Sequence, residues 1–185
     1  MPIQLITPAL QYQTSYQAYI EELGDETRYP FPMDFAHADF PALLARLDEF
    51  RQGINIPDGF VPSSTYWLVE GNELLGVSNL RHHLNNRIRH VGGHIGLGVR
   101  PSRRGTGLGK TLLKLTLAKA AEKAITPIHV HCYKHNEPSA RMILANGGQL
   151  DSEIAEAGEV VQRYLIGRHD NTPQASRSNN NLHRE

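Results

Sequence analysis

Apolar and polar residues follow two different spacings along this chain, and the spacing predicts which segments are strands and which are helices. Alternating or briefly continuous apolar runs that end at Gly, Pro or Asn predict strands, whereas apolar residues three and four apart predict helices. Leu43, Leu44, Leu47 and Phe50 form such a helical stripe behind Pro41, a residue suited to a first helical turn. The predicted strands are residues 3–7, 65–70, 74–81, 95–99, 128–133 and 160–166, and the predicted helices are residues 12–23, 41–50, 110–124 and 138–146.

Predicted strands and helices are mixed along the chain, which indicates an α/β fold. With 185 residues the chain is long enough for one substantial core, and we expect a single domain over residues 1–168. From residue 168 onward the chain is rich in Asn, Ser and Arg and has almost no apolar residue. Such a segment buries too little apolar surface to offset the entropy of ordering it. We therefore expect residues 169–185 to be a disordered polar tail.

The most informative segment is a glycine-rich turn, Arg103-Arg104-Gly-Thr-Gly-Leu-Gly109, which lies between the apolar run 95–99 and the helix predicted from Lys110. Glycines let backbone N–H groups approach a ligand closely, and a helix N-terminus adds a partial positive charge. The turn therefore predicts a cradle for a phosphate or pyrophosphate. Asn136, just after the next predicted strand, indicates that the ligand extends past the phosphates.

Three kinds of phosphate cradle are separated by their glycine spacing. A P-loop, G-x-x-x-x-G-K-[ST], shares the Gly-Lys-Thr ending but needs glycine where this chain has Arg104, and no later strand ends in an Asp for magnesium. A Rossmann turn, G-x-G-x-x-G, is one residue longer than the spacing of Gly105, Gly107 and Gly109. The third pattern, [QR]-x-x-G-x-[GA], is met by Arg104, Gly107 and Gly109, and it resembles the pyrophosphate loop of acyl-CoA-dependent N-acetyltransferases.

Two longer motifs resemble the GNAT superfamily of N-acetyltransferases. The first runs from Gly92 to Lys110 as GGHIGLGVRPSRRGTGLGK, and the second runs from Asn136 to Gly148 as NEPSARMILANGG. A weaker likeness continues upstream through LLGVSNLRH, which ends at His82. The combination is similar to a bacterial branch of predicted acetyltransferases.

This resemblance implies a central, mostly antiparallel sheet flanked by helices, and acetyl-CoA as the acyl donor. It further implies that the pantetheine arm pairs with the backbone of strand 95–99 and that the pyrophosphate lies on the glycine-rich turn. Asn136 would bond the pantetheine amides, although a plain turn residue is an alternative. The implied acetyl-CoA-binding residues are Leu97, Gly98, Val99, Arg104, Gly105, Thr106, Gly107, Leu108, Gly109, Lys110 and Asn136.

The sequence motifs do not identify the general base. His94 stands at the start of strand 95–99, where some superfamily members place a glutamate base. An unperturbed histidine titrates near ~6.5, which suits removal of an ammonium proton through water. A surface or capping histidine is the alternative, and His82 and His83 are weaker candidates for the base.

The general acid departs from the superfamily pattern. Many members have a tyrosine in the second motif, and aligning Gly147 with the glycine of that motif puts Ile143 in its place. Either Tyr133 or Ser139 then protonates the leaving thiolate, or water does. A thiol pKa of about 8.5 makes protonation by water tolerable.

Composition adds limits on partners and location. The formal net charge is zero, so nothing points to nucleic acid or an anionic membrane as a partner. The basic residues from Arg100 to Lys123 either lie near the coenzyme A phosphates or form a solvated helix face. No apolar run approaches the ~20 residues that a bilayer requires, so we expect a cytoplasmic protein.

Cysteine and histidine in strand 128–133 do not predict a metal site. Strand alternation puts His129 and His131 on one face and Cys132 on the other, and we expect no metal. Cys132 is also the only cysteine, which excludes an intrachain disulfide.

The predicted function is transfer of an acetyl group from acetyl-CoA to a primary amine, with a small molecule favoured over a protein as the acceptor. Segments 28–40 and 82–89 should set the acceptor. One alternative is a non-catalytic acyl-CoA-binding or sensing module, supported by the missing tyrosine. A P-loop nucleotide hydrolase is another, against which Arg104 argues. Formation of a homodimer is left open.

Overall fold

Four antiparallel strands form the larger sheet of the molecule, in the order β1-β2-β3-β4. The structure is a computed structural model that describes residues 1–167. The strands are β1 (Ile3–Ile6), β2 (Ser63–Glu70), β3 (Glu73–Arg81) and β4 (Ile95–Val99). A tight turn at Gly71 and Asn72, with Gly71 at φ +56°, joins β2 to β3. This sheet leaves β4 as an edge strand.

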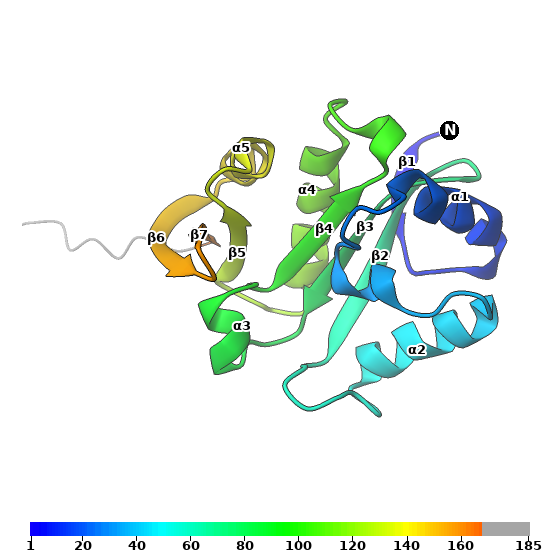
Figure 1. The fold of residues 1–185 in the computed structure, drawn as a ribbon, viewed down its shortest axis with the longest axis horizontal. Coiled ribbons are helices and arrows are strands. Elements are labelled where there is room, and N and C mark those ends of the chain that lie inside the picture. Colours follow the sequence, from blue (N-terminus) through cyan, green and yellow to red (C-terminus); the bar gives the residue numbers. More distant parts are fainter. Residues whose placement is uncertain (168–185) are drawn as a thin grey trace, which may run out of the picture.

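Helices cover both faces of this sheet, which explains why almost every residue of β2 and β3 is buried (Figure 1). Trp67 and Val69 of β2 share an apolar cluster with α1 (Gln13–Leu23) and α2 (Phe40–Gln52). Leu68, which points to the opposite face by strand alternation, packs in a second cluster with Leu112 of α4 (Leu108–Glu122). Burial on both faces explains why apolar residues are consecutive, not alternating with polar ones, at Trp67, Leu68 and Val69 of β2.

A second sheet, in the order β5-β7-β6, contains the C-terminal strands and is also antiparallel. Its strands are β5 (Ile128–Tyr133), β6 (Gln149–Glu156) and β7 (Glu159–Ile166), and α5 (Glu137–Ala145) connects β5 to β6. In Figure 1 this sheet lies beside β4, with α4 and α5 next to each other above the gap between the two sheets.

The two sheets meet at one point, at the start of β4. Gly93 forms an isolated bridge with Val130 of β5, and the backbone N–H of His94 donates to the carbonyl of His129 at 2.7 Å. Within residues 1–167, β4 pairs along its length only with β3. The edge of β4 that faces β5 is therefore open from Ile95 onward.

The predicted α/β class with antiparallel pairing is confirmed, but the sheet is divided into two. All predicted strands and helices are present, with ends that differ by two residues or fewer. The prediction missed β6 and the short helix α3 (Asn86–His90), and also three 3-10 turns, η1 (Leu10–Tyr12), η2 (Phe31–Asp34) and η3 (Pro101–Arg103). The antiparallel pairing of β4 also excludes a P-loop hydrolase, whose cradle follows a strand of a parallel sheet. The predicted tail, residues 169–185, lies outside the described residues.

Candidate acetyl-CoA and acceptor site

The glycine-rich turn forms a concave backbone surface in front of α4. Gly105 and Gly107 have φ values of +75° and +85°, a region that disfavours any residue with a side chain. Gly107 is the N-cap of α4, and no side chain of the described residues caps this helix. A Cβ atom added at Gly105 or Gly107 would meet no heavy atom within 4 Å. An uncapped helix N-terminus behind a turn with open space at its glycines fits a phosphate-bearing ligand.

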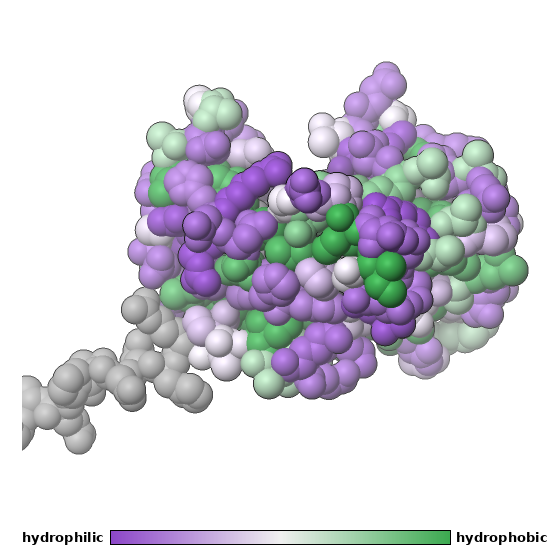
Figure 2. All heavy atoms as spheres, turned by 90° about the horizontal axis from the view of Figure 1, so that it is seen from below, coloured by the Kyte–Doolittle hydropathy of each residue, from purple (hydrophilic) through white to green (hydrophobic). Residues whose placement is uncertain are grey.

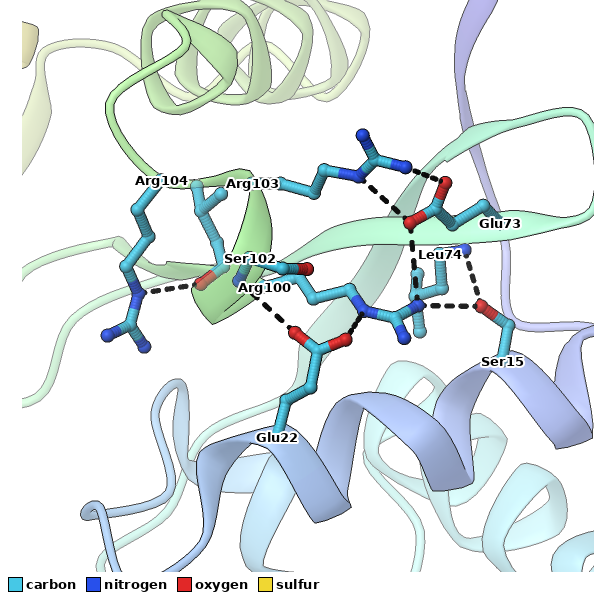
Figure 3. A network of polar contacts seen from close by, with 9 residues as sticks. Ser15, Glu22, Glu73, Leu74, Arg100, Ser102, Arg103 and Arg104 are labelled. Carbon is cyan, nitrogen blue, oxygen red and sulfur yellow. Dashed lines mark hydrogen bonds and ion pairs between the residues drawn. The ribbon is translucent and has the colours of Figure 1, made fainter.

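The arginines before this turn are held by acidic side chains (Figure 3). Arg100 is nearly buried, and its Nε donates to Glu22 of α1 at 2.6 Å. Arg103 pairs with Glu73 of β3. Arg104 donates from Nε to the carbonyl of Val99 at 3.1 Å and pairs with Glu26 at 2.8 Å.

These contacts alter the expectation that Arg103 and Arg104 are free for phosphate. Both side chains are ion-paired in the structure, and their pairing raises the pKa of each guanidinium, mainly through the hydrogen bonds that Arg103 donates to Glu73 and Arg104 donates to Glu26. Lys110 is exposed in the first turn of α4, and no ion pair to it occurs among residues 1–167. Thr106 turns back on the loop, because its Oγ1 donates to the carbonyl of Arg103 at 2.6 Å.

The loop between α1 and α2 lies directly against β4, and two glycines of the strand make room for it. A Cβ atom at Gly98 would collide with the carbonyl oxygen of Tyr29, and one at Gly96 would lie 3.1 Å from the Tyr29 hydroxyl. The alternation Gly96-Leu97-Gly98 therefore lets one face of β4 receive this loop, while the free edge of the strand stays open toward β5.

A pocket of about 540 Å³ lies where this loop, β3, β5 and α5 come together. Figure 2 shows the molecule from below, where apolar residues are exposed in the middle of the face between hydrophilic margins. The lining residues are Thr27, Tyr29, Arg81, Val91, Gly92, His131, Cys132, Tyr133, Asn136, Ser139 and Val161. The structure thus brings three predicted site residues into one pocket: Tyr133, Ser139 and Asn136.

Asn136 caps α5, since its Oδ1 accepts from the backbone N–H of Ser139 at 3.3 Å. Its Nδ2 has no hydrogen-bond partner among the described residues, so the amide can both cap the helix and donate to a ligand. Tyr133 is 48% exposed, and its ring stacks on that of His135. Ile143, in the place of the missing tyrosine, is buried in the core.

His94 has the contacts of a structural residue. It is 6% exposed, and its Nδ1 accepts from the backbone N–H of His129 at 3.0 Å. Burial, and to a lesser extent the nearby His129, lower the pKa of His94 to about 4. With Nδ1 occupied as an acceptor, the neutral ring carries its proton on Nε2. This geometry argues against the predicted role of His94 as general base, because the ring has no free lone pair.

Two residues of β5 that line the pocket are also neutral. Burial lowers the pKa of His131 to about 4, and its Nδ1 accepts from the N–H of Gly92 at 3.1 Å. Burial raises the pKa of the Cys132 thiol to about 11, which leaves little thiolate for nucleophilic chemistry at neutral pH. No group of three or more His, Cys, Asp or Glu side chains in the described part of the chain is placed to hold a metal ion.

Arg81 and Tyr29 are among the pocket residues that the sequence did not predict as site residues. Arg81 was noted only within the LLGVSNLRH motif, and Tyr29 only within the aromatic segment 28–40. Their position at a strand end and in a loop is a weak signal of function. Only the fold identifies them, because it brings Tyr29 and Arg81, which are 52 positions apart in the sequence, into the lining of one pocket.

The family model described as "Acetyltransferase (GNAT) family" matches residues 17–147, which includes β4, the glycine-rich turn and α5. The chain belongs to the GNAT family of acetyltransferases. This GNAT protein is an acyl-CoA-dependent N-acetyltransferase, with acetyl-CoA as its co-substrate. A search of curated protein sequences returned no match.

Solved structures of other acetyltransferases share the fold of this GNAT protein at low sequence identity. One is RimL, a ribosomal L7/L12 alpha-N-protein acetyltransferase in complex with coenzyme A, at 15% identity and TM-score 0.65, covering 89% of this chain and 93% of that one. A ribosomal-protein-S5-alanine acetyltransferase from Vibrio fischeri has 14% identity and a TM-score of 0.64, with 89% of this chain and 92% of that chain covered. Mutant forms of the spermidine/spermine N-acetyltransferase SpeG from Vibrio cholerae have 14% identity and a TM-score of 0.57, with 89% of this chain and 94% of that chain covered. Among the described residues, the helices are all too short or too polar to cross a bilayer.

Proposed function

We propose that this GNAT protein acetylates a primary amine of a small molecule. The observation that carries this proposal is the lining of the pocket, in which no Asp or Glu side chain takes part. A polyamine or a basic protein tail would call for acidic groups around its additional positive charges. The volume of about 540 Å³ is in the range of small-molecule sites and is partly roofed by the loop that carries Tyr29.

The donor would bind along β4 and the turn that follows it. The N–H groups from Gly105 to Lys110 would hold the pyrophosphate, with support from the positive end of the α4 dipole. The open edge of β4 at Leu97, Gly98 and Val99 would pair with the pantetheine arm. Asn136 would donate its free amide hydrogens to the same arm.

Acetyl transfer requires a neutral amine and a proton for the leaving thiolate. Arg81 lines the pocket, and a positive charge nearby lowers the pKa of a bound amine by disfavouring its ammonium form. Selection of the neutral amine by the pocket therefore replaces the histidine base. The amine nitrogen forms its bond to the acetyl carbon, the carbon–sulfur bond breaks, and the surplus amine proton leaves to water.

Tyr133 is the better candidate for the acid that protonates the thiolate. A phenol is a far stronger acid than an aliphatic hydroxyl such as that of Ser139, so it is the better matched of the two to a thiolate leaving group. Both side chains line the pocket, and Tyr133 retains a half-exposed ring.

The test is release of free thiol from acetyl-CoA in the presence of amine panels, with amino acids, polyamines, aminoglycosides and peptides as separate groups. We expect turnover with small monoamines and little with polyamines or peptides. Equal or faster turnover of peptides would contradict a small-molecule acceptor. Acetyl-CoA binding by calorimetry without turnover of any amine would instead favour an acyl-CoA-binding or sensing module, which the burial of Ile143 in place of the usual tyrosine would then explain.

A further inference from the structure

Arg81 is the last residue of β3 and places a half-buried guanidinium at the pocket. Its backbone N–H donates to the carbonyl of His94 at 2.8 Å, which fixes the start of the side chain. Its Nη1 donates to the carbonyl of Gly93 at 2.8 Å. The guanidinium carbon lies 5.7 Å from the ring centroid of Phe31, within reach of a cation–π contact. The side chain is held in place by neutral groups alone.

No carboxylate of residues 1–167 lies within ion-pair distance of Arg81, in contrast to Arg100, Arg103 and Arg104. A guanidinium has five N–H donors, and the hydrogen bond from Arg81 to Gly93 uses one of them. A partly buried charge without a counter-ion is costly, because its lost hydration is not replaced. An anion from outside the chain would offset this cost.

The other lining side chains reinforce the positive character of the pocket. His131 and Cys132 are neutral at pH 7 for the reasons given above. Arg81 is therefore the one ionised side chain in a lining made of hydroxyls, an amide, neutral rings and apolar groups. A ligand with a single negative charge matches this lining.

That charge is not a phosphate of the donor. Arg81 stands beside His94 at one end of β4, whereas the cradle begins beyond Val99 at the other end. The five residues of β4 span roughly 16 Å at 3.3 Å per residue, so the guanidinium and the phosphates lie at opposite ends of the strand. The anion that Arg81 meets must belong to the acceptor.

We infer that the acceptor is an amine that also carries a carboxylate, such as a free amino acid, and that Arg81 binds this carboxylate. This inference rests on the proposed function. The planar fork of a guanidinium matches the two oxygens of a carboxylate, which a lysine at this position would not.

The test compares matched acceptors that differ only in the carboxylate. Leucine, phenylalanine, β-alanine and γ-aminobutyrate are each measured against their carboxamide and their decarboxylated amine by thiol release. A carboxamide has a less basic amine and is intrinsically the better acceptor at neutral pH, so a preference for the acid reports recognition. We expect kcat/KM for at least one acid to exceed that of its two partners by about 30-fold, the scale of a hydrogen-bonded charge pair.

Substitution assigns this preference to Arg81. Arg81→Gln should lower kcat/KM for the acid about 30-fold more than kcat/KM for the carboxamide, because both acceptors lose the positive charge beside the amine and only the acid also loses the partner of its carboxylate. Arg81→Lys, which keeps the charge, should retain part of the preference. Arg163→Gln is the matched control, because Arg163 is also half-buried and donates to a neutral oxygen, that of Ser152 at 2.9 Å, but does not line the pocket.

Failure of this inference is distinguishable from failure of the proposed function. Turnover of amines with no preference for any acid, or with a preference that survives in Arg81→Gln, overturns the inference and leaves acetyl transfer intact. If no amine is turned over, calorimetry with leucine and leucinamide on the coenzyme A-saturated protein decides. Leucine binding that is lost in Arg81→Gln supports carboxylate recognition, and equal or absent binding of the two probes overturns it.

Discussion

Arg104 and Glu26 are joined at two points: Nη1 and Nη2 of Arg104 donate to the two carboxylate oxygens of Glu26 at 3.1 and 2.8 Å. Arg104 begins the glycine-rich turn, and Glu26 immediately precedes Thr27 of the acceptor pocket. The pair therefore connects the proposed donor cradle to the loop that roofs the acceptor site. Both side chains are exposed, so the pair adds little to stability, and its effect should be on binding.

Glu26→Gln should tighten coenzyme A binding about threefold at low salt. The substitution frees Arg104 and removes a negative charge within a Debye length of the proposed phosphate site. Calorimetry at two ionic strengths measures the effect, which should shrink as salt rises. Glu49→Gln, which breaks a comparable pair with Arg46 on α2, is the control and should change nothing. Weaker binding in Glu26→Gln would show that the pair holds Arg104 in place for the phosphates.

Gly107→Asp should weaken coenzyme A binding by at least ~2 kcal/mol, about 30-fold, because it places a carboxylate where backbone should approach pyrophosphate. Gly158→Asp in the β6–β7 turn is the control variant. It introduces the same side chain at a similar φ of +82°, in equally open space, so it matches the backbone strain of Gly107→Asp at φ +85°. Affinities of the two folded variants are compared by calorimetry. Equal affinities of the two variants for coenzyme A would contradict binding of the pyrophosphate at this turn.

His94→Asn should flatten the pH dependence of stability and spare activity. The pKa of His94 is about 4 in the folded state and near ~6.5 when unfolded, so between these values the unfolded chain binds more protons. The contribution of neutral His94 to the free energy of unfolding is therefore complete above pH ~6.5 and is lost as the pH falls toward 4. Asparagine keeps an acceptor near the Nδ1 position but does not titrate.

Melting temperatures from pH 7.5 to 4.5 test this prediction for wild type and variant. The slope of melting temperature against pH should be smaller in the variant than in wild type but not zero, because His131 also has a pKa of about 4 and titrates in the same pH range. The kcat/KM of the variant should stay within about threefold of wild type. A loss of kcat near 100-fold, with the acid-side inflection of the pH–rate profile abolished, would restore His94 as the general base.

Tyr133→Phe should lower kcat about 100-fold at pH 7 with little change in the dissociation constant of coenzyme A, the usual scale for loss of a general acid. The deficit should narrow above pH ~8.5, where the free thiolate no longer requires a proton. Ser139→Ala is the paired variant and should retain kcat within about threefold. The opposite ranking would move the acid to Ser139, and two unaffected variants would leave protonation to water.

Sequence spacing was sufficient where an element owes its form to local pattern. The ends of β4 and β5 were predicted to the residue, because β4 is a short apolar run, β5 begins with Ile and Val alternating with His, and polar residues follow both strands. The strand β6 was missed because Asp151, Ser152 and Glu153 interrupt its apolar pattern. It is an edge strand that pairs with β7, and edge strands tolerate or favour charged residues.

The site residues were less accessible to sequence reasoning, because their properties arise from distant partners. The low pKa of His94 follows from burial and from a contact with His129, 35 positions away. The ion pair of Arg103 depends on Glu73, 30 positions away. No motif could reveal that Arg81 has no acidic partner, since this depends on where every carboxylate of the fold lies.

The single junction between the two sheets determines how the space between them can vary. Beyond the bridge of Gly93 with Val130, the contact between the sheets is an apolar cluster that includes Ile95, Ile128 and Ile143 rather than a ladder of hydrogen bonds. Hydrogen bonds weaken steeply when their angle changes, whereas apolar contacts have no preferred direction. The angle between the two sheets can therefore change about the Gly93–Val130 bridge by small repacking of side chains. At the proposed acceptor site, such repacking would admit acceptors of different width without breaking a hydrogen bond between strands.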